Sequence, residues 1–257
     1  TNYTQNETQQ AFDNLVVTGA VPESIINQIL KEKSVITQES STSDPIPKGV
    51  DAVFFTNGGT VNLSSLSGKP PKDLNLLVFQ TDENDPVDLT IPYNLAASIV
   101  LGDGDDKATS NAGNQNYTAG SGNDSVSSGN GRDTVSGGDG NDTISSGNGN
   151  DSVSGGNGND SIGTGAGNDT IVTGSGNDSI DAGAGNDYIR LAESTTKGNI
   201  QINGGAGADK LDLRDVDVAS MEAITTTNAR GKIVTIGAEI TLTDGTKLTV
   251  IQWPFYL

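Results

Sequence analysis

The chain has 257 residues and a formal net charge of −19, with 33 acidic side chains against 14 basic ones. Such an excess of negative charge repels nucleic acid phosphates and anionic membrane surfaces, so cations are the expected partners. The sequence has no cysteine and no histidine, which excludes disulfides, zinc sites built on these residues and serine–histidine triads.

Residues 1–48 are predicted to form an N-terminal extension. Pro22 at a first helical position, followed by isoleucines and a leucine at helical spacing, predicts a short amphipathic helix that ends near Lys33. The serines and prolines of residues 37–48 are typical of a linker. No run of 18 apolar residues occurs in the chain, so no transmembrane segment is predicted.

Residues 49–101 are predicted to form an N-terminal β cap. Runs rich in β-branched and apolar residues predict strands over residues 50–55, 60–66, 74–80, 87–91 and 95–101, separated by turns such as Asn57-Gly58-Gly59. These strands lead directly into Gly102. We expect them to cover the first turn of the region that follows, because the open end of a repeat structure exposes core and unpaired backbone.

Residues 102–191 divide into ten consecutive nonapeptides without a gap. In order they read GDGDDKATS, NAGNQNYTA, GSGNDSVSS, GNGRDTVSG, GDGNDTISS, GNGNDSVSG, GNGNDSIGT, GAGNDTIVT, GSGNDSIDA and GAGNDYIRL, and an eleventh copy follows at residues 204–212. Glycine at the first and third positions permits the positive φ angles of a tight turn. The residues around the seventh position predict a very short strand with one inward side chain.

One inward residue per nonapeptide predicts a thin apolar column. Its members are Ala108, Tyr117, Val126, Val135, Ile144, Val153, Ile162, Ile171, Ile180 and Ile189. Such a column cannot offset the chain entropy alone. Within residues 102–191 there are 13 aspartates against two arginines and one lysine, so we expect this segment to be disordered unless cations neutralise it.

The repeated pattern is that of a calcium-binding β-helix repeat, and it resembles the RTX (repeats-in-toxin) family over roughly 110 of the 257 residues. The resemblance implies a parallel β-roll in which 18 residues make one turn and each calcium ion lies between stacked turns. The expected fold is therefore all-β: a β-roll over residues 102–191, mainly β caps at both ends and one short N-terminal helix.

The resemblance also implies which residues bind calcium. One edge of the roll would carry Asp106, Asp124, Asp142, Asp160 and Asp178, and the other Asp133, Asp151, Asp169 and Asp187, with Asp209 in the eleventh copy. The accompanying loop glycines are Gly120, Gly122, Gly129, Gly131, Gly138, Gly140, Gly147, Gly149, Gly156, Gly158, Gly165, Gly167, Gly174 and Gly176. Carboxylate and carbonyl oxygens select a hard cation, and calcium accepts this flexible set better than magnesium.

Gln115 stands where the first aspartate of the second edge is expected. Counting neighbouring aspartate pairs gives four sites on the first edge and three on the second, or about seven ions. We predict a weak or empty position at Gln115, because a neutral amide can coordinate an ion but cannot neutralise its charge.

Residues 192–257 are predicted to form a C-terminal β cap that includes the eleventh copy. Strands are predicted over residues 200–203, 210–218, 232–236, 239–243 and 247–251, with Asp244-Gly245 as the turn of a hairpin. The last five residues hold three of the chain's eleven aromatic side chains. They are interpreted as core of the cap, as a self-association surface, or as part of the C-terminal export signal that RTX-like proteins present to type I secretion machinery.

The repeat alone does not specify an activity. Without histidine there is no H-E-x-x-H motif, and no G-x-S-x-G lies at a strand-to-helix turn, so we do not expect an enzyme. The first hypothesis is a secreted structural or cell-surface protein that assembles with itself into an extracellular layer, sheath or filament. The second is an adhesive module for cell-surface glycans from a larger secreted protein, and the third is the non-catalytic part of a secreted hydrolase.

Overall fold

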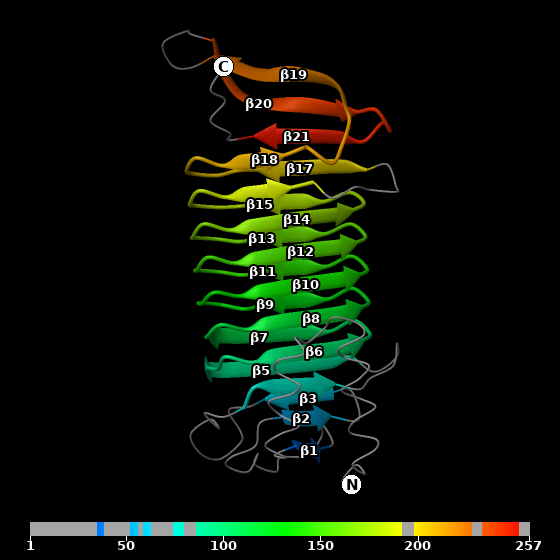
Figure 1. Cartoon of the computed structure of the whole chain (residues 1–257), viewed down its shortest axis with the longest axis vertical. Helices are drawn as coiled ribbons and strands as arrows, with labels where there is room; N and C mark the ends of the chain where they lie inside the picture. The colour runs from blue at the N-terminus through cyan, green and yellow to red at the C-terminus, as the bar shows by residue number, and fades with distance from the viewer. Residues whose placement is uncertain are drawn as a thin grey trace.

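The computed structural model describes residues 35–38, 52–55, 59–62, 74–79, 86–191, 198–227 and 233–251. Over these residues the chain is an all-β solenoid whose strands alternate between two facing sheets (Figure 1). The helix predicted over residues 22–33 lies outside the described residues. Among those that are described, no helix has the length and apolar character needed to cross a membrane.

Ten strands form the first sheet. In spatial order they are β1 (Val35–Gln38), β2 (Ala52–Phe55), β4 (Leu76–Phe79), β6 (Ser98–Asp103), β8 (Asn116–Ser121), β10 (Thr134–Asp139), β12 (Ser152–Asn157), β14 (Thr170–Ser175), β16 (Tyr188–Arg190) and β18 (Lys210–Asp212). All neighbours in this sheet pair in parallel.

Eleven strands form the second sheet. Eight of them stack in the order β3 (Gly59–Asn62), β5 (Val87–Asn94), β7 (Lys107–Ala112), β9 (Ser125–Ser127), β11 (Thr143–Ser145), β13 (Ser161–Gly163), β15 (Ser179–Asp181) and β17 (Asn199–Asn203). The sheet then continues through β21 (Lys247–Ile251), β20 (Ile233–Leu242) and β19 (Val218–Thr227). The chain therefore passes from one sheet to the other at every loop of the repeats.

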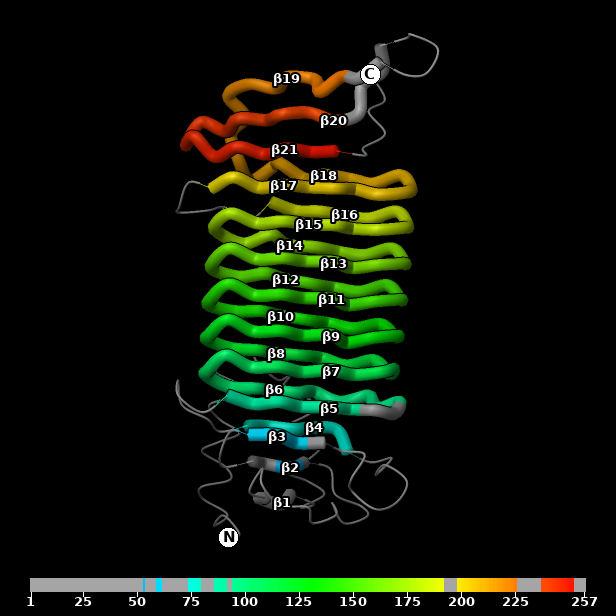
Figure 2. Tube along the Cα trace, turned by 180° about the vertical axis from the view of Figure 1, so that it is seen from behind, coloured from blue at the N-terminus to red at the C-terminus, as the bar shows by residue number. Residues whose placement is uncertain are grey.

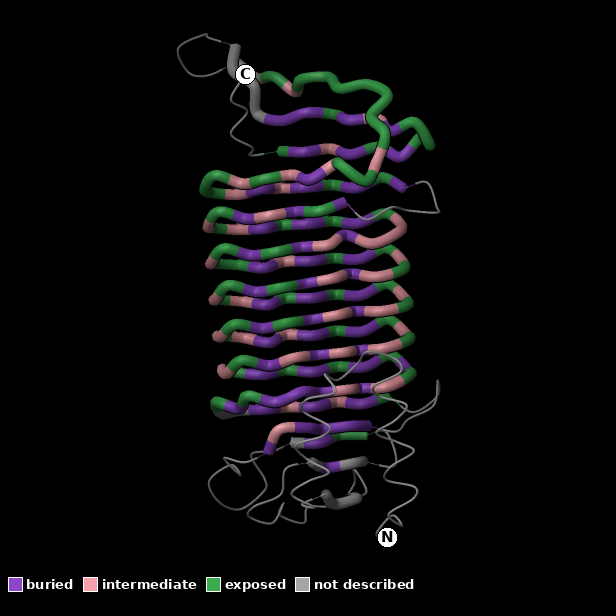
Figure 3. The backbone as a smooth tube through the Cα atoms, viewed as in Figure 1, coloured by how far each residue is buried: buried purple, intermediate pink, exposed green. Residues whose placement is uncertain are grey.

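The register confirms a turn of 18 residues. In the first sheet Val135 pairs with Val153, which pairs with Ile171, and in the second sheet Ile144 pairs with Ile162. Every residue of the predicted inward column is at most 2% exposed. Figure 3 shows the resulting alternation of buried and exposed residues along the strands. The core is thus a double row of identical or similar side chains, which parallel in-register stacking brings into contact.

Parallel stacking continues below Gly102, with a register shift between β5 and β7 at Ile91/Asn94. In the first sheet Val53 pairs with Leu77, Leu77 with Ile99, and Ile99 with Tyr117. Strands β2 to β6 are therefore further turns of the same solenoid, although their sequences lack the nonapeptide pattern. Their turns enclose larger apolar side chains than the repeats above them do.

Exposed asparagines form a ladder beside the loops. Asn141 donates from its backbone NH and from its side-chain Nδ2 to Oδ1 of Asn123, both at 2.9 Å. Asn159 and Asn177 repeat the contact one and two turns further along. These amide ladders tie each loop to the previous one, as in other stacks of in-register strands.

The C-terminal end departs from the parallel pattern. Strand β20 pairs antiparallel with both β21 and β19, and Figure 2 shows these three strands extending the second sheet beyond β17. The predicted hairpin joins β20 and β21 through Asp244-Gly245, with Gly245 at a φ of 94°. The strand predicted over residues 210–218 ends at Asp212 in β18, and the two separate strands predicted over residues 232–236 and 239–243 are the single strand β20. Strand β19 was not predicted.

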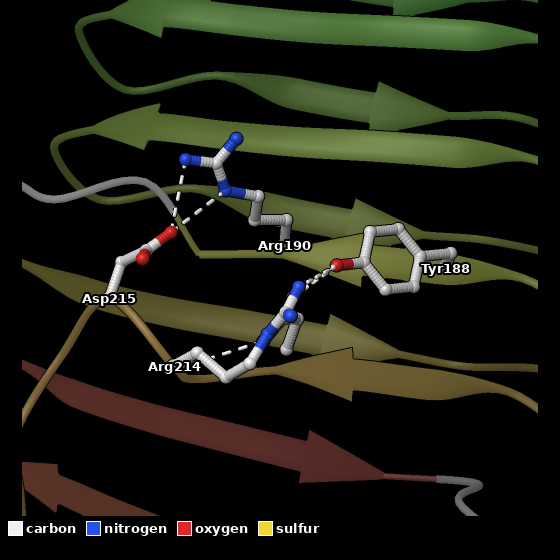
Figure 4. Close-up of polar contacts among 5 residues, drawn as sticks. Tyr188, Arg190, Arg214 and Asp215 are labelled. Atoms are coloured by element: carbon white, nitrogen blue, oxygen red, sulfur yellow. Dashed lines mark hydrogen bonds and ion pairs between the residues drawn. The ribbon is translucent and has the colours of Figure 1, made fainter.

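A polar cluster fixes the last turn of the first sheet (Figure 4). The hydroxyl of Tyr188 donates to Oδ2 of Asp212, and Arg214 Nε donates to Asp212 Oδ1 at 2.8 Å. The hydrogen bonds from Arg214, followed by that from Tyr188, hold the pKa of Asp212 below its ordinary value. A neighbouring ion pair joins Arg190 Nη2 to Asp215 Oδ2 at 3.0 Å. These contacts connect β16 and β18 to the segment that leads into β19.

Candidate metal centre

The loops between the sheets lie along two edges of the solenoid. Loops of the first edge lead from the first sheet to the second, and loops of the second edge lead back. Asp106, Asp124, Asp142, Asp160 and Asp178 lie on the first edge, and Gln115, Asp133, Asp151, Asp169, Asp187 and Asp209 lie on the second. Except for Asp209, these side chains belong to residues that are at most 3% exposed. Buried carboxylates are rare unless a partner compensates their charge.

Each of these aspartates reaches back to the previous turn. On the first edge, Oδ1 of Asp142 accepts a hydrogen bond from the backbone NH of Asp124 at 2.9 Å, and Asp160 does the same for Asp142. On the second edge Asp151 accepts from Asp133 at 2.9 Å, and Asp209 accepts from Asp187 at 3.0 Å. The structure thus brings the predicted aspartates into two continuous columns. Asp209, in the eleventh copy, extends the second column beyond the end of the ten consecutive nonapeptides at residue 191.

The second carboxylate oxygen, Oδ2, of these aspartates makes no such contact with the chain. Oδ2 is buried and has no hydrogen-bond partner in Asp106, Asp124, Asp133, Asp142, Asp151, Asp160, Asp169, Asp178, Asp187 and Asp209. An anionic oxygen removed from water without a partner costs several kcal/mol. Ten such atoms in two regular columns are a set of positions that cations would satisfy.

Glycine makes room for backbone carbonyls next to these carboxylates. All the loop glycines predicted as ligands have φ angles between 85° and 153°. A Cβ atom at Gly140 would lie 1.8 Å from the carbonyl oxygen of Gly122, one turn below. At Gly137 a Cβ would lie 2.3 Å from Oδ2 of Asp142 and 2.4 Å from the carbonyl oxygen of Gly155. A carboxylate oxygen and a carbonyl oxygen from the next turn therefore border the same small space.

The pKa values of the protein without metal reflect the same unfavourable burial. Burial raises the pKa of Asp124 to about 7, and the neighbouring carboxylates of Asp106 and Asp142 raise it further against the hydrogen bond from the Asp106 NH. Burial likewise raises the pKa of Asp142 and of Asp178 to about 6. A cation beside these oxygens would reverse the shift, because opposite charge favours the ionised carboxylate.

The donor set fits calcium. Among the described residues no three or more acidic, histidine or cysteine side chains converge on one point, so each ion would take one or two stacked aspartates and complete its shell with loop carbonyls. Calcium accepts six to eight oxygen ligands in flexible geometry, whereas magnesium requires a near-ideal octahedron. Bound calcium would neutralise the paired carboxylates and hold adjacent loops together.

A buried row of hydroxyl groups was missed from the sequence. Ser128, Ser146 and Thr164 precede the loops of the second edge and are completely buried. Ser128 Oγ donates to the carbonyl of Ser146 at 3.1 Å, and Ser146 Oγ donates to that of Thr164 at 3.2 Å. The recurrence of a small residue at the ninth position of the first nine blocks was the available signal. These hydroxyls add hydrogen bonds between turns beside the carboxylate column.

Residues 127–162 and 163–193 each match a family model described as the RTX calcium-binding nonapeptide repeat. This model comprises four copies of the repeat. The matched part is about a quarter of the chain and includes aspartates of both edges. A comparison with curated proteins found no matching relative.

Proposed function

We propose that the chain is a secreted structural protein that folds when it meets calcium outside the cell, because residues 127–162 and 163–193 match the RTX calcium-binding nonapeptide repeat. The observation that carries this proposal is the double column of ten buried aspartates, each with an unpartnered Oδ2. A fold that buries so many anionic oxygens depends on a cation for its stability.

Calcium concentration would then determine where the chain folds. Extracellular modules bind calcium with dissociation constants of roughly 10⁻⁴ to 10⁻³ M, far above cytosolic calcium levels. If free calcium is ten times the dissociation constant, each ion contributes about 1.4 kcal/mol, and about seven ions contribute on the order of 10 kcal/mol. This sum equals the stability of a typical domain. Most of the β-roll would stay unfolded inside the cell and fold after export.

The C-terminal end supports self-association. Strand β19 is the last strand of the second sheet, and no other described strand pairs with its outer edge. It carries two exposed apolar side chains, Val218 at 43% and Met221 at 56%, and Glu222 is its single charged residue. An open edge strand of this kind is a template for pairing with another chain. We infer that a second copy adds to β19 in an extracellular layer, sheath or filament.

Electron microscopy and light scattering with and without calcium test this function. The protein should form ordered assemblies when calcium is added and release them when it is chelated. Met221→Lys should abolish assembly and preserve calcium-induced folding by circular dichroism, because a charged edge opposes strand pairing. Ser161→Lys, on an exposed position of β13, is the matched control and should still assemble. A calcium-loaded wild type that remains monomeric at high concentration would contradict self-assembly.

A further inference from the structure

Gln115 makes a contact that none of the aspartates can make. Its Nε2 donates to the carbonyl oxygen of Leu95 in the turn below at 2.6 Å, and to that of Ala112 in its own loop at 2.8 Å. A Cβ atom added to Gly113 would lie 2.8 Å from the same nitrogen. The amide group therefore lies inside the loop stack, between carbonyls of two successive turns, and not in solvent.

Backbone hydrogen bonds identify the equivalent carbonyls in the turns above. The NH of Leu95 donates to the carbonyl of Ala112, the NH of Gly113 to that of Asn130, and the NH of Gly131 to that of Asn148. Leu95 and Ala112 are thus the lowest members of a repeated pair. For Asp133 the equivalent pair is Gly113 in the turn below and Asn130 in its own loop, and Oδ2 of Asp133 has no hydrogen-bond partner.

The chemical contrast between the two turns is simple. In the upper turn the carbonyl oxygens and the carboxylate oxygen are all acceptors, and a cation would satisfy them together and also neutralise the carboxylate charge. At Gln115 the side chain supplies two N–H donors that bind the two carbonyls directly. Its Oε1 is buried without a hydrogen-bond partner, but this oxygen is neutral, unlike the carboxylate oxygen of an aspartate. The amide nitrogen provides the positive partial charge that calcium would provide in the other loops.

The core at and below this position contains the bulkiest buried side chains. Tyr117 and Phe79 are the two largest among the buried residues that the structure describes, and Leu74, Leu77 and Leu89 are buried in the same part of the solenoid. The inward column from residue 126 to residue 189 holds only valine and isoleucine. The hydroxyl of Tyr117 also hydrogen-bonds to that of Ser110 inside the solenoid. Apolar burial of this kind stabilises the fold without any ion.

We propose that Gln115 replaces a calcium ion at the first position of the second edge, so that residues 86–119 form a platform that stays folded on this edge without calcium. Calcium-bound turns then add to this platform in the direction of the C-terminus. The proposal rests on the proposed calcium-dependent folding, because it assigns the one position of the column that does not need the ion.

Ion counting and hydrogen exchange on the full chain test the platform. Bound calcium per chain is measured by equilibrium dialysis for wild type, for Gln115→Asp and for the reciprocal variant Asp169→Gln. Gln115→Asp should bind one more ion than wild type, and Asp169→Gln at least one fewer. In chelator, amides of residues 86–119 of the wild type should exchange at least about tenfold more slowly than those of residues 134–175.

The outcomes separate the two proposals. A wild type that binds no calcium would overturn the proposed function. A wild type that binds calcium would refute the platform alone if Gln115→Asp gained no ion, or if both segments exchanged equally fast in chelator. The exchange measurement uses only the wild type, so it remains decisive if Gln115→Asp fails to fold.

Discussion

The backbone NH of Asp124 donates to Oδ1 of Asp142 across one turn of the solenoid at 2.9 Å, while Oδ2 of the same carboxylate has no protein partner. One oxygen of each aspartate therefore binds the chain and the other remains available to a cation. This arrangement repeats along both edges, and it distinguishes the aspartates proposed to bind an ion from acidic residues that lie on the surface.

Replacing Asp142 by asparagine tests this separation of roles. The amide of the variant would keep an oxygen that can accept from Asp124 but would lose the charge that a calcium ion requires. We expect Asp142→Asn to raise the calcium midpoint of folding and to lower the free energy of unfolding at fixed calcium by at least about 1.4 kcal/mol, the contribution of one site at ten times its dissociation constant. Circular dichroism during calcium and urea titrations measures both quantities.

Asp139 provides a matched control in the same loop. Its side chain is exposed and accepts from Asn157 Nδ2 at 2.7 Å, a contact that asparagine can preserve. Asp139→Asn should change the free energy of unfolding by no more than about 0.5 kcal/mol. Equal effects of the two substitutions would show that only overall charge matters and would refute the ligand assignment.

Glycine substitutions test the close stacking of the loops. Gly140 has a φ of 133°, and a Cβ there would lie 1.8 Å from a backbone oxygen, so Gly140→Ala should prevent this turn from forming even at high calcium. Gly163 has no atom within 4 Å of its Cβ position, and Gly163→Ala should leave the calcium midpoint unchanged. Calcium-dependent circular dichroism of both variants measures the contrast, and equal behaviour would contradict the stacked loop geometry.

The thin core should still matter when calcium is saturating. Ile162 is 2% exposed and stacks between Ile144 and Ile180. We expect Ile162→Ala to lower the free energy of unfolding by about 2–5 kcal/mol, through lost burial and the cavity left behind. Urea unfolding in excess calcium measures this loss. Ser161→Ala, which changes the exposed neighbour, should stay within about 0.5 kcal/mol of wild type.

Acid should partly substitute for calcium. In the protein without metal, burial raises the pKa of Asp124 to about 7 and the pKa of Asp106 and of Asp187 to about 6, from an ordinary value of 3.8. The folded state then binds more protons than the unfolded state, so its stability is greatest below about pH 4 and is lost as the pH rises through about 6 and 7.

In chelator, the circular dichroism signal of the solenoid should therefore grow as the pH falls from about 7.5 to about 5. With calcium present, the circular dichroism signal should instead weaken as the pH falls, because protons compete with the ion for the same oxygens. A metal-free protein with the same signal at both pH values would contradict the burial of these carboxylates in the folded chain.

The repeats could be predicted from sequence because the same nine-residue pattern recurs without a gap over residues 102–191. The inward column from Ala108 to Ile189 and the positive φ angles of the loop glycines follow from spacing and from the conformational limits of each residue type. The family resemblance added the 18-residue turn, the calcium and the two edges. In this region the preferences of individual residues and the packing of successive turns favour the same structure, so the fold could be predicted from one sequence.

The flanks could not be predicted to the same depth. Strands β2 to β6 stack in the same parallel solenoid, but larger apolar residues specify them without a fixed period, so the sequence indicated strands and not their pairing. Strand β19 was hidden because its alternation is weak and its residues are mostly exposed. The role of Gln115 depended on two carbonyls, at Leu95 and Ala112, whose approach only the folded chain reveals.

Pairing from β6 to β16 in the first sheet keeps a constant offset of 18 residues, and neighbouring strands lie about 4.8 Å apart. Removing residues 137–154 would therefore join Ser136 to Gly155 in phase and shorten the solenoid by one strand spacing. Removing only nine residues would send every later strand to the opposite sheet and exchange the two edges. The distance between the two ends of the repeat region is therefore set by the number of nonapeptide pairs, and each pair adds one strand spacing.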